Sequence, residues 1–319
     1  MNVSDPCNRP PGRNGVGASC VVLPSTSTNQ WPTVLEFLVQ RFPHVSAAQW
    51  CQRMDAGAVM DEHGIPIRAD CSYHSVRRPC RLYYFRTLEV EPKIPFEARV
   101  LWRDDHLLVV DKPHFLPVVP SGKYLQETLL VRLKRALDND ALVPVHRIDR
   151  DTAGLVLFSL QPTTRNLYHG LFRQRAVEKT YEAIAPWNPD MSLSWPLRRE
   201  SRIVAGAHFM QQIEVAGNPN AITHIRPVEV QGALARYVLQ PVTGQRHQLR
   251  VHMAALGLPL VGDGIYPTLT PEGSANYARP LQLLARNIAF TDPLNGVNRQ
   301  FESSQKLRTL TDIHADARS

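Results

Sequence analysis

The stretch that decides the fold is HRIDRDTAG at residues 146–154, which runs directly into the apolar sequence LVLF at 155–158. It places two carboxylates among arginines and a histidine in the turn before a buried strand. Asp149 is therefore expected at the mouth of a sheet, where neighbouring cations favour the charged form of a carboxyl group. A charged carboxylate suits a nucleophile or a base and does not suit an acid. A loop whose salt bridges are only structural fits the same residues.

Apolar runs on both sides of this stretch predict one large domain over residues 96–304. The expected strands are of mixed character with few crossover helices, which favours an α+β fold over a doubly wound α/β fold. No glycine-rich nucleotide-binding loop and no internal repeat accompany them. Strands are predicted at 107–110, 155–158, 181–184 and 235–239, and helices at about 167–172 and 247–256, the second ending at Gly257.

The second informative stretch is TGQRHQLRVH at residues 243–252. Arg246, His247 and Arg250 are expected along one edge of the predicted helix. Arg250 adjoins the apolar stripe of that helix and so needs a carboxylate partner. The alternative is a surface arginine whose stem covers the stripe. His247 and His252 are five residues apart and do not share a helix face, which argues against a metal site.

The N-terminal part divides into a leader and a small module. Residues 1–30 are rich in Pro, Gly, Ser, Asn and Thr, which predicts a flexible leader. Residues 31–88 read as a module with two helix starts and a short hairpin between Gly57 and Gly64. The helix starts are marked by Thr33 with Glu36 and by Ser46 with Gln49.

The last segment of this module, RRPCRLYYFR at residues 77–86, interleaves basic and aromatic residues. This pattern suits phosphate contacts and base stacking. An amphipathic edge strand with solvated arginines is the alternative. The residues predicted to contact RNA are Arg77, Arg78, Arg81 and Tyr83.

Bulk properties narrow the class of partner. The 319-residue chain carries a net charge of +7, which favours a polyanionic partner such as RNA, DNA or an anionic membrane, although a basic protein without such a partner also fits. No apolar run is long enough to span a bilayer and no secretory signal is present, so a cytoplasmic location is expected. The five cysteines form no C-x-x-C pair and are expected to be free thiols, with a metal site the less favoured alternative for Cys71, Cys80, His63 and His74.

Several motifs resemble one family. HRIDRDTAG resembles the H-R-L-D-x-D-T-S-G motif of the RluA family of RNA pseudouridine synthases, and KTY at 179–181 resembles its K-x-Y motif. TGQRHQLRVH resembles T-G-R-T-H-Q-L-R-V-H, and Gly262-Asp263-x-x-Tyr266 follows as in the family. DDH at 104–106 through KP at 112–113 matches the family's opening strand. The N-terminal module resembles, more loosely, the ribosomal-protein-like RNA-binding module that often precedes such domains.

The resemblance implies a catalytic domain with a mixed, largely antiparallel sheet at 96–304 and a tail at 305–319. It implies isomerisation of uridine to pseudouridine in large-subunit ribosomal RNA or transfer RNA, by a monomer, without metal or cofactor. Asp149 is the implied initiator. Tyr181 would stack on the base, and Arg250 would form a bidentate ion pair with Asp149. The implied substrate-binding residues are His146, Arg147, Thr152, Arg246, His247 and Lys112.

The chain also departs from the family pattern. Ile148 and Ala153 replace Leu and Ser, Gln245-Arg246 replaces Arg-Thr, His114-Phe115 replaces a small residue with glycine, and Leu284 replaces a histidine. These changes bear on substrate choice more than on chemistry. Two other functions fit the residues: a non-catalytic RNA-binding protein, and a glycoside hydrolase or nucleosidase built on Asp149 and Asp151. The i, i+2 spacing of these carboxylates argues weakly against such a pair and against a Mg²⁺ site.

Overall fold

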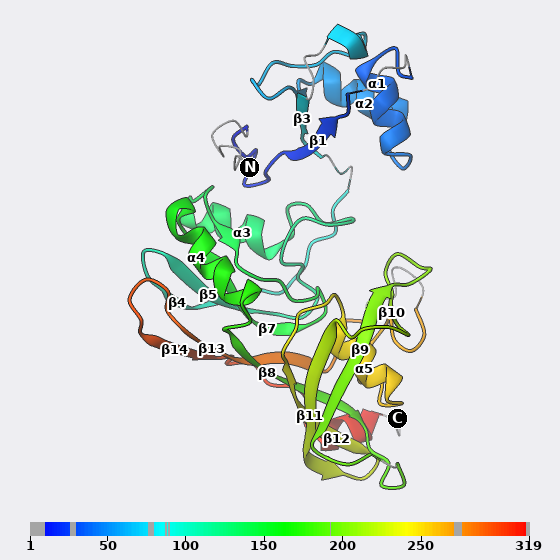
Figure 1. Cartoon of the computed structure of the whole chain (residues 1–319), viewed down its shortest axis with the longest axis vertical. Helices are drawn as coiled ribbons and strands as arrows, with labels where there is room; N and C mark the ends of the chain where they lie inside the picture. Colours follow the sequence, from blue (N-terminus) through cyan, green and yellow to red (C-terminus); the bar gives the residue numbers. More distant parts are fainter. Residues whose placement is uncertain are drawn as a thin grey trace. The chain divides into compact units, whose positions relative to one another are not determined.

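The computed structural model describes residues 10–25, 30–75, 80–86, 88, 90–191, 193–270 and 276–316. The chain forms two compact units (Figure 1). The first comprises Met1–Pro92, Pro120–Glu127 and Val131–Asp140, and the second comprises Lys93–Val119, Thr128–Leu130 and Ala141–Ser319. Within the described ranges, no helix has the length and apolar character needed to cross a membrane.

The first unit contains a small antiparallel sheet in the order β1-β3-β2, with two helices that contact each other. Both helix starts read from the sequence are confirmed, since the hydroxyls of Thr33 and Ser46 accept from the backbone N–H of Glu36 and Gln49. Trp50 and Tyr73 are fully buried in its core. The elements are β1 (Ser19–Leu23), α1 (Val34–Arg41), α2 (Ala47–Asp55), β2 (Val59–Met60), the 3₁₀ turn Tyr73–Ser75 and β3 (Cys80–Tyr84).

The expectation of a flexible leader up to residue 30 is wrong for β1. This strand pairs with β3 over its whole length, from Ser19 opposite Tyr84 to Leu23 opposite Cys80. Leu23 is fully buried in the aromatic core of the unit. A composition typical of loops was therefore overridden by pairing with a strand about sixty positions later in the chain.

The second unit is built on a mixed, largely antiparallel sheet in the order β10-β9-β11-β12-β8-β13-β7-β5-β4, as expected for its α+β class. β14 pairs with β13 and β6 with β7, and the parallel pair is β13 with β7. The elements are β4 (Arg99–Arg103), β5 (Leu107–Lys112), β6 (Val143–Pro144), β7 (Ala153–Ser159), α4 (Pro162–Arg173), β8 (Glu178–Pro186), β9 (Leu197–Ala205), β10 (Gln212–Val215), β11 (Ala221–Gln231), β12 (Leu234–Pro241), α5 (Gln248–Ala255), β13 (Leu283–Thr291), β14 (Asn298–Glu302) and α6 (Leu310–Asp316). Helix α3 (Leu129–Leu137) starts in this unit, and its residues from Val131 onward belong to the first unit.

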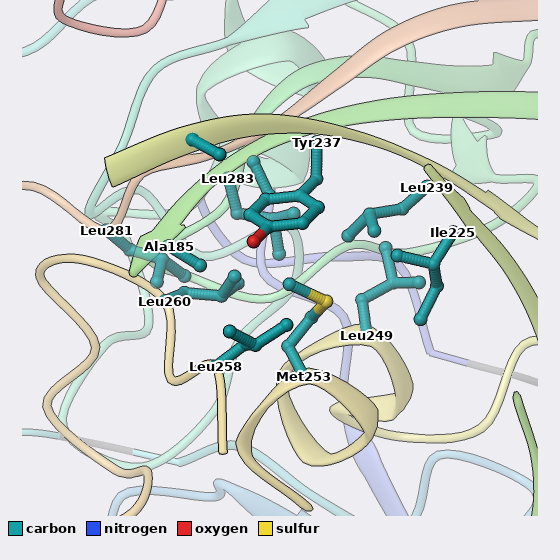
Figure 2. Packing of buried hydrophobic residues seen from close by; sticks show 12 residues of the cluster. Ala185, Ile225, Tyr237, Leu239, Leu249, Met253, Leu258, Leu260, Leu281 and Leu283 are labelled. Carbon is teal, nitrogen blue, oxygen red and sulfur yellow. The ribbon is translucent and has the colours of Figure 1, made fainter. Parts of the chain in front are cut away.

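Helix α5 is fixed to this sheet by an apolar cluster. Figure 2 shows Leu249 and Met253 reaching from α5 toward Tyr237 and Leu239 of β12. Met253 and Tyr237 are fully buried, and the Tyr237 hydroxyl donates to the carbonyl oxygen of Pro186 at 2.9 Å. Burial of such side chains contributes roughly 1.5–3 kcal/mol each relative to exposure. The side chains on the remaining face of α5 are therefore held at fixed positions.

The C-terminal segment is not the tail that the sequence suggested. The buried carboxylate of Asp111 accepts hydrogen bonds from the Ser303 hydroxyl at 2.7 Å, the Ser304 backbone N–H at 2.8 Å and the Gln305 side-chain amide at 2.7 Å. Beyond this clamp, Leu307 and Leu310 are buried in a cluster with Ala153, Ile184 and Leu284. The segment thus completes the core beneath β7.

Candidate active site

The Asp149 loop joins β6 to β7 and is braced by the end of β5. Lys112, the last residue of β5, donates its ammonium to the carbonyl oxygens of Pro113 at 2.8 Å and Arg150 at 2.9 Å. The His114 ring lies 2.7 Å from the carbonyl oxygen of Asp151. The loop therefore has a fixed path although it contains little regular structure.

Gly154 fixes the exit of the same loop. Its φ is +108°, and a Cβ built on it would lie 2.3 Å from the carbonyl oxygen of Ala285 on β13. Only glycine tolerates both the left-handed backbone and this approach. The glycine that ends the HRIDRDTAG stretch therefore sets how closely β7 and β13 pack behind Asp149.

Arg250 links two carboxylates at the centre of the site. From α5 its Nε and Nη2 donate to the two carboxylate oxygens of Asp263 at 2.8 and 2.6 Å. Its Nη1 donates to Oδ2 of Asp149 at 3.2 Å. The two-pronged partner is thus Asp263, which corrects the expectation that Arg250 would hold Asp149 in that way. Arg250 is 2% exposed, Asp263 0% and Asp149 24%, so Asp149 is the carboxylate open to a substrate.

Asp263 is the main residue that the sequence reading missed. The motif containing it was recognised, but its carboxylate was given no role. Besides Arg250, it accepts from the backbone N–H groups of Ile265 and Tyr266 at 2.8 and 3.0 Å. The pKa of Arg250 is raised because these carboxylate contacts, Asp263 foremost, outweigh the burial that would lower it. A buried arginine that must stay charged was the available signal, since it calls for more than one acceptor.

Tyr181 lies on β8, with Leu239 of β12 and Ala285 of β13 opposite it in the ladders. Burial first, and the negative charge of Asp149 second, raise the pKa of its hydroxyl. The hydroxyl therefore keeps its proton at neutral pH. The aromatic ring lies close enough to Asp149 for the carboxylate charge to affect it.

His247 lies beside Asp149 rather than on the helix edge where it was expected. Helix α5 begins at Gln248, and His247 precedes it with a left-handed backbone, φ 57°. Its Nε2 is 3.8 Å from Oδ1 of Asp149. Burial lowers the pKa of its imidazole, as do the charges of Arg250 and Arg246, while Asp149 works in the opposite direction. The ring is therefore neutral at neutral pH.

Comparison with known proteins identifies this arrangement. The profile of the RNA pseudouridylate synthase family matches residues 106–255. An uncharacterized RNA pseudouridine synthase of Synechocystis is 30% identical over 240 residues, 73% of this chain and 79% of that protein. The dual-specificity RNA pseudouridine synthase RluA of Escherichia coli K12 is 33% identical over 215 residues, 64% of this chain and 91% of that protein. The chain belongs to the RluA family of RNA pseudouridine synthases.

Solved structures agree on the fold of this synthase. Human RNA pseudouridylate synthase domain containing 1 is similar with a TM-score of 0.54 and 20% identity, over 72% of this chain and 98% of that one. Human RNA pseudouridylate synthase domain containing 4 gives a TM-score of 0.50 and 26% identity, over 69% and 92%. The synthase fold inferred from the motifs is thus confirmed.

Three of the residues expected to bind substrate have their polar groups turned inward. Lys112 is fully buried and donates its hydrogen bonds to the backbone carbonyl oxygens of Pro113 and Arg150. Thr152 is 2% exposed. Nε2 of His146 accepts from the Leu157 backbone N–H at 3.2 Å while its ring stacks on Phe172. The printed hydrogen bonds of Lys112 and His146 are made within the protein, and they help to shape the site.

The remaining residues of that set keep accessible polar groups. Arg147 is exposed on the Asp149 loop. Arg246 is also exposed, and its Nη1 donates to the carbonyl oxygen of Phe209 at 3.0 Å. With His247 next to Asp149, these cations lie on the segments that carry the reactive groups. Arg147, Arg246 and His247 stay the predicted substrate-binding residues.

The residues predicted to contact RNA in the N-terminal module differ in their exposure. Arg77 and Arg78 lie outside the described residues. Arg81 is exposed on β3. Tyr83 is 6% exposed and packs with Met60 and Phe85, so it is a core residue and is not available for base stacking.

Metal ligands do not gather in the part of the synthase that the structure describes. No group of three or more His, Cys, Asp or Glu side chains there could hold a metal ion. The four described cysteines, Cys20, Cys51, Cys71 and Cys80, are free thiols.

Proposed function

We propose that this synthase isomerises specific uridines in structured RNA, either large-subunit ribosomal RNA or transfer RNA, with Asp149 initiating the reaction and without a cofactor. One observation carries the proposal. Arg250 is fixed by its two hydrogen bonds to Asp263 and donates a further N–H to Oδ2 of Asp149, while Oδ1 of Asp149 receives no hydrogen bond from Arg250. A carboxylate held in a fixed position is what a nucleophile or base requires.

The reaction balances without any added reagent. The bond between N1 of uracil and C1′ of the ribose breaks, the base turns, and C5 bonds to C1′. The C5 proton passes to solvent and N1 gains a proton, so the product is an isomer of the substrate. Asp149 starts this sequence by attacking C1′ or by removing a sugar proton, and Tyr181 stacks on the base. Drawing the uridine out of its helix or loop costs a few kcal/mol, which basic and stacking contacts offset.

The neighbouring carboxylate supports isomerisation over glycoside hydrolysis. A hydrolase of the paired-carboxylate type needs one carboxyl group that is protonated. Burial works to raise the pKa of Asp151, but the charge and hydrogen bond of Arg150 lower it below its usual value. Asp151 is bonded to Nε of Arg150 at 2.8 Å and stays ionised, so it is poorly suited to be the acid of such a pair.

The deciding experiment replaces Asp149 with Asn, which keeps the shape of the side chain and removes its charge. Tritium release from C5-labelled RNA of a strain lacking the enzyme should vanish, while binding of that RNA persists. Asp190→Asn is the matched control, because Asp190 is exposed and belongs to none of the segments that carry the site residues. Near-normal turnover by Asp149→Asn, or release of free uracil by the parent enzyme, would overturn the proposal.

Two further measurements address the finer parts of the proposal. Mapping pseudouridines in RNA from the deletion strain identifies the target RNA and the modified positions. Activity should survive excess chelator when monovalent salt keeps the RNA folded. A loss of turnover that only zinc or magnesium restores, with RNA structure shown to be intact, contradicts a metal-free reaction.

A further inference from the structure

The imidazole of His247 lies between the catalytic carboxylate and a phenol. Its Nε2 is 3.8 Å from Oδ1 of Asp149, and its Nδ1 is 2.9 Å from the hydroxyl oxygen of Tyr266. The side chain of His247 is 8% exposed, so bulk water has little access to either nitrogen. Whether Nε2 of His247 carries a hydrogen that it can donate to Asp149 therefore depends on the partner of Nδ1.

The hydrogen-bond donors assign the direction of each contact. The Gln212 backbone N–H donates to the Tyr266 hydroxyl oxygen at 2.7 Å, so that oxygen already acts as an acceptor. Burial raises the pKa of Tyr266, and the hydroxyl keeps its hydrogen at neutral pH. The hydrogen is then donated to Nδ1 of His247, which must be the unprotonated nitrogen of a neutral ring. Nε2 therefore carries the imidazole hydrogen and presents it to Asp149.

The backbone conformation of His247 also fixes the position of its ring. His247 has φ 57° and makes no side-chain capping bond to α5, although it occupies the N-cap position. A left-handed backbone is unfavourable for a non-glycine residue and persists where the surroundings enforce it, often at functional sites. The conformation places the ring between Asp149 and Tyr266 instead of using it to cap the helix.

We propose that Tyr266 and the Gln212 backbone hold His247 as a neutral donor that orients Oδ1 of Asp149 without adding a second positive charge. Arg250 orients Oδ2, and His247 orients Oδ1 when bound RNA brings the two groups into hydrogen-bond range. His247 is a positioning residue and Tyr266 acts through it. The inference rests on the proposed role of Asp149 as the initiating group.

The charge of His247 matters because the groups around it are already nearly balanced. Four charged side chains act on the pKa of the imidazole. They are the carboxylates of Asp149 and Asp263 and the guanidinium groups of Arg246 and Arg250. A protonated His247 would form a second ion pair with Asp149 and make that carboxylate a weaker nucleophile or base. A donated hydrogen bond at Nδ1 opposes protonation, since protonation requires the lone pair that the bond uses.

Tyr266→Phe tests this arrangement by deleting only the hydroxyl. The ring that packs edge-on against His247 at 5.7 Å and lies 5.4 Å from the Arg250 guanidinium is kept. Without the donor at Nδ1, the pKa of His247 should rise, so the acid limb of kcat should move to higher pH. Turnover at neutral pH should fall by up to about 10-fold, the upper end of the scale for one lost hydrogen bond between neutral groups.

A second substitution separates charge from structure. In the double variant Tyr266→Phe with His247→Gln, the titrating group is gone while an amide donor remains, so the acid limb should return toward that of the parent. Tyr277→Phe deletes an equivalent hydroxyl from a tyrosine that is 43% exposed, and it should keep the parental limb. kcat is followed by tritium release from C5-labelled RNA of the deletion strain.

The outcomes distinguish this inference from the proposed function. An unshifted acid limb in Tyr266→Phe, or a shift that persists in the double variant, would overturn the role of His247 even if Asp149→Asn is inactive. Turnover by Asp149→Asn would instead overturn the proposed function, and the inference with it. A ¹⁵N spectrum with hydrogen on Nδ1 of His247 at neutral pH would also exclude the assigned tautomer.

Discussion

Arg250 is the active-site residue whose loss should cost the most stability. It is 2% exposed and its partner Asp263 is 0% exposed, so Arg250→Leu leaves an unpaired buried carboxylate. The expected loss in free energy of unfolding is about 3–5 kcal/mol, and Asp149→Asn should lose less because Asp149 is 24% exposed. Denaturant melts of the two variants measure the difference.

The double variant Arg250→Leu with Asp263→Leu checks the cause of this loss. It should be less destabilised than the sum of its single variants, because no lone charge remains in the core. Simple additivity of the two single effects would show that Arg250 and Asp263 do not act as a pair. Turnover should be lost in every variant that lacks Arg250.

Lys112 gives the synthase a stability that depends on pH. Burial lowers its pKa to about 7, against 10.5 for the free amine. Between these values the unfolded chain binds a proton that the folded chain lacks, so stability rises with pH by about 1.4 kcal/mol per unit. Below pH 7 both states are protonated and this dependence disappears.

Lys112→Met removes the titrating group and isolates this effect. The advantage of the parent over the variant in free energy of unfolding should grow from pH 7 to pH 9 and stay level between pH 5.5 and pH 6.5. Urea melts at these pH values give the two curves. Parallel curves above pH 7 would show that the amine stays charged in the folded protein.

Residue identities at the site could be read from the sequence, but their pairing could not. Asp149, Tyr181 and Arg250 stand in motifs long enough to single them out, and the structure brings all three to one place. The sequence gives no distance between Arg250 and the carboxylates around it, so it does not reveal that Asp263 is the partner bound through two hydrogen bonds. The left-handed backbone of His247 also left no mark on the helical pattern.

At the scale of elements, Gly154 ties β7 to β13. Gly154→Ala should destabilise the synthase by several kcal/mol, because its Cβ would lie 2.3 Å from the Ala285 carbonyl oxygen at a φ of +108°. Turnover should fall as well, since the Asp149 loop leads into this residue. Thermal melts and tritium release report the two effects.

Gly170→Ala is the matched control for that substitution. Gly170 lies within α4, where a Cβ would meet only the end of the Arg173 side chain at 3.8 Å. Alanine should stabilise this helix by about 0.5–1 kcal/mol, because glycine has the greater freedom in the unfolded chain. Equal effects at the two positions would rule out the close approach at Gly154 as the cause.

Elements with continuous apolar sequence were predictable, and elements with alternating or non-local character were not. The strands expected at 107–110 and 155–158 fall within β5 and β7, which are buried along their whole length. β9, β11 and β14 were missed because exposed polar or charged residues alternate with buried or partly buried ones over much of their length. β1 was missed because its partner is β3, far along the chain.

At the scale of the whole molecule, the N-terminal unit is expected to add RNA affinity. Each phosphate contact that is lost should reduce the salt dependence of binding by about one counterion. Arg81→Gln removes an exposed charge from β3 and should flatten the slope of log K against log salt, while Arg81→Lys should keep it. Fluorescence anisotropy over a salt series gives both slopes.

Point variants are the better test of this unit than deletion of its residues. Val16 of the N-terminal part packs with Leu125 and Val131, which belong to the same compact unit but follow later in the chain. Removing residues 1–90 would expose these two side chains, and any loss of binding would be hard to assign. Identical slopes for Arg81→Gln and Arg81→Lys would refute an electrostatic contribution from β3.

The place of β13 between β8 and β7 has a consequence for the synthesis of the protein. A ribosome delivers β7 and β8 first, then residues 187–282, and only afterwards the strand that separates them. Until residue 291 emerges, β7 and β8 each offer an unpaired backbone edge, and such edges pair readily with other chains. A translational pause between residues 187 and 282 therefore lengthens the period in which the nascent chain aggregates, whereas a pause after residue 291 does not.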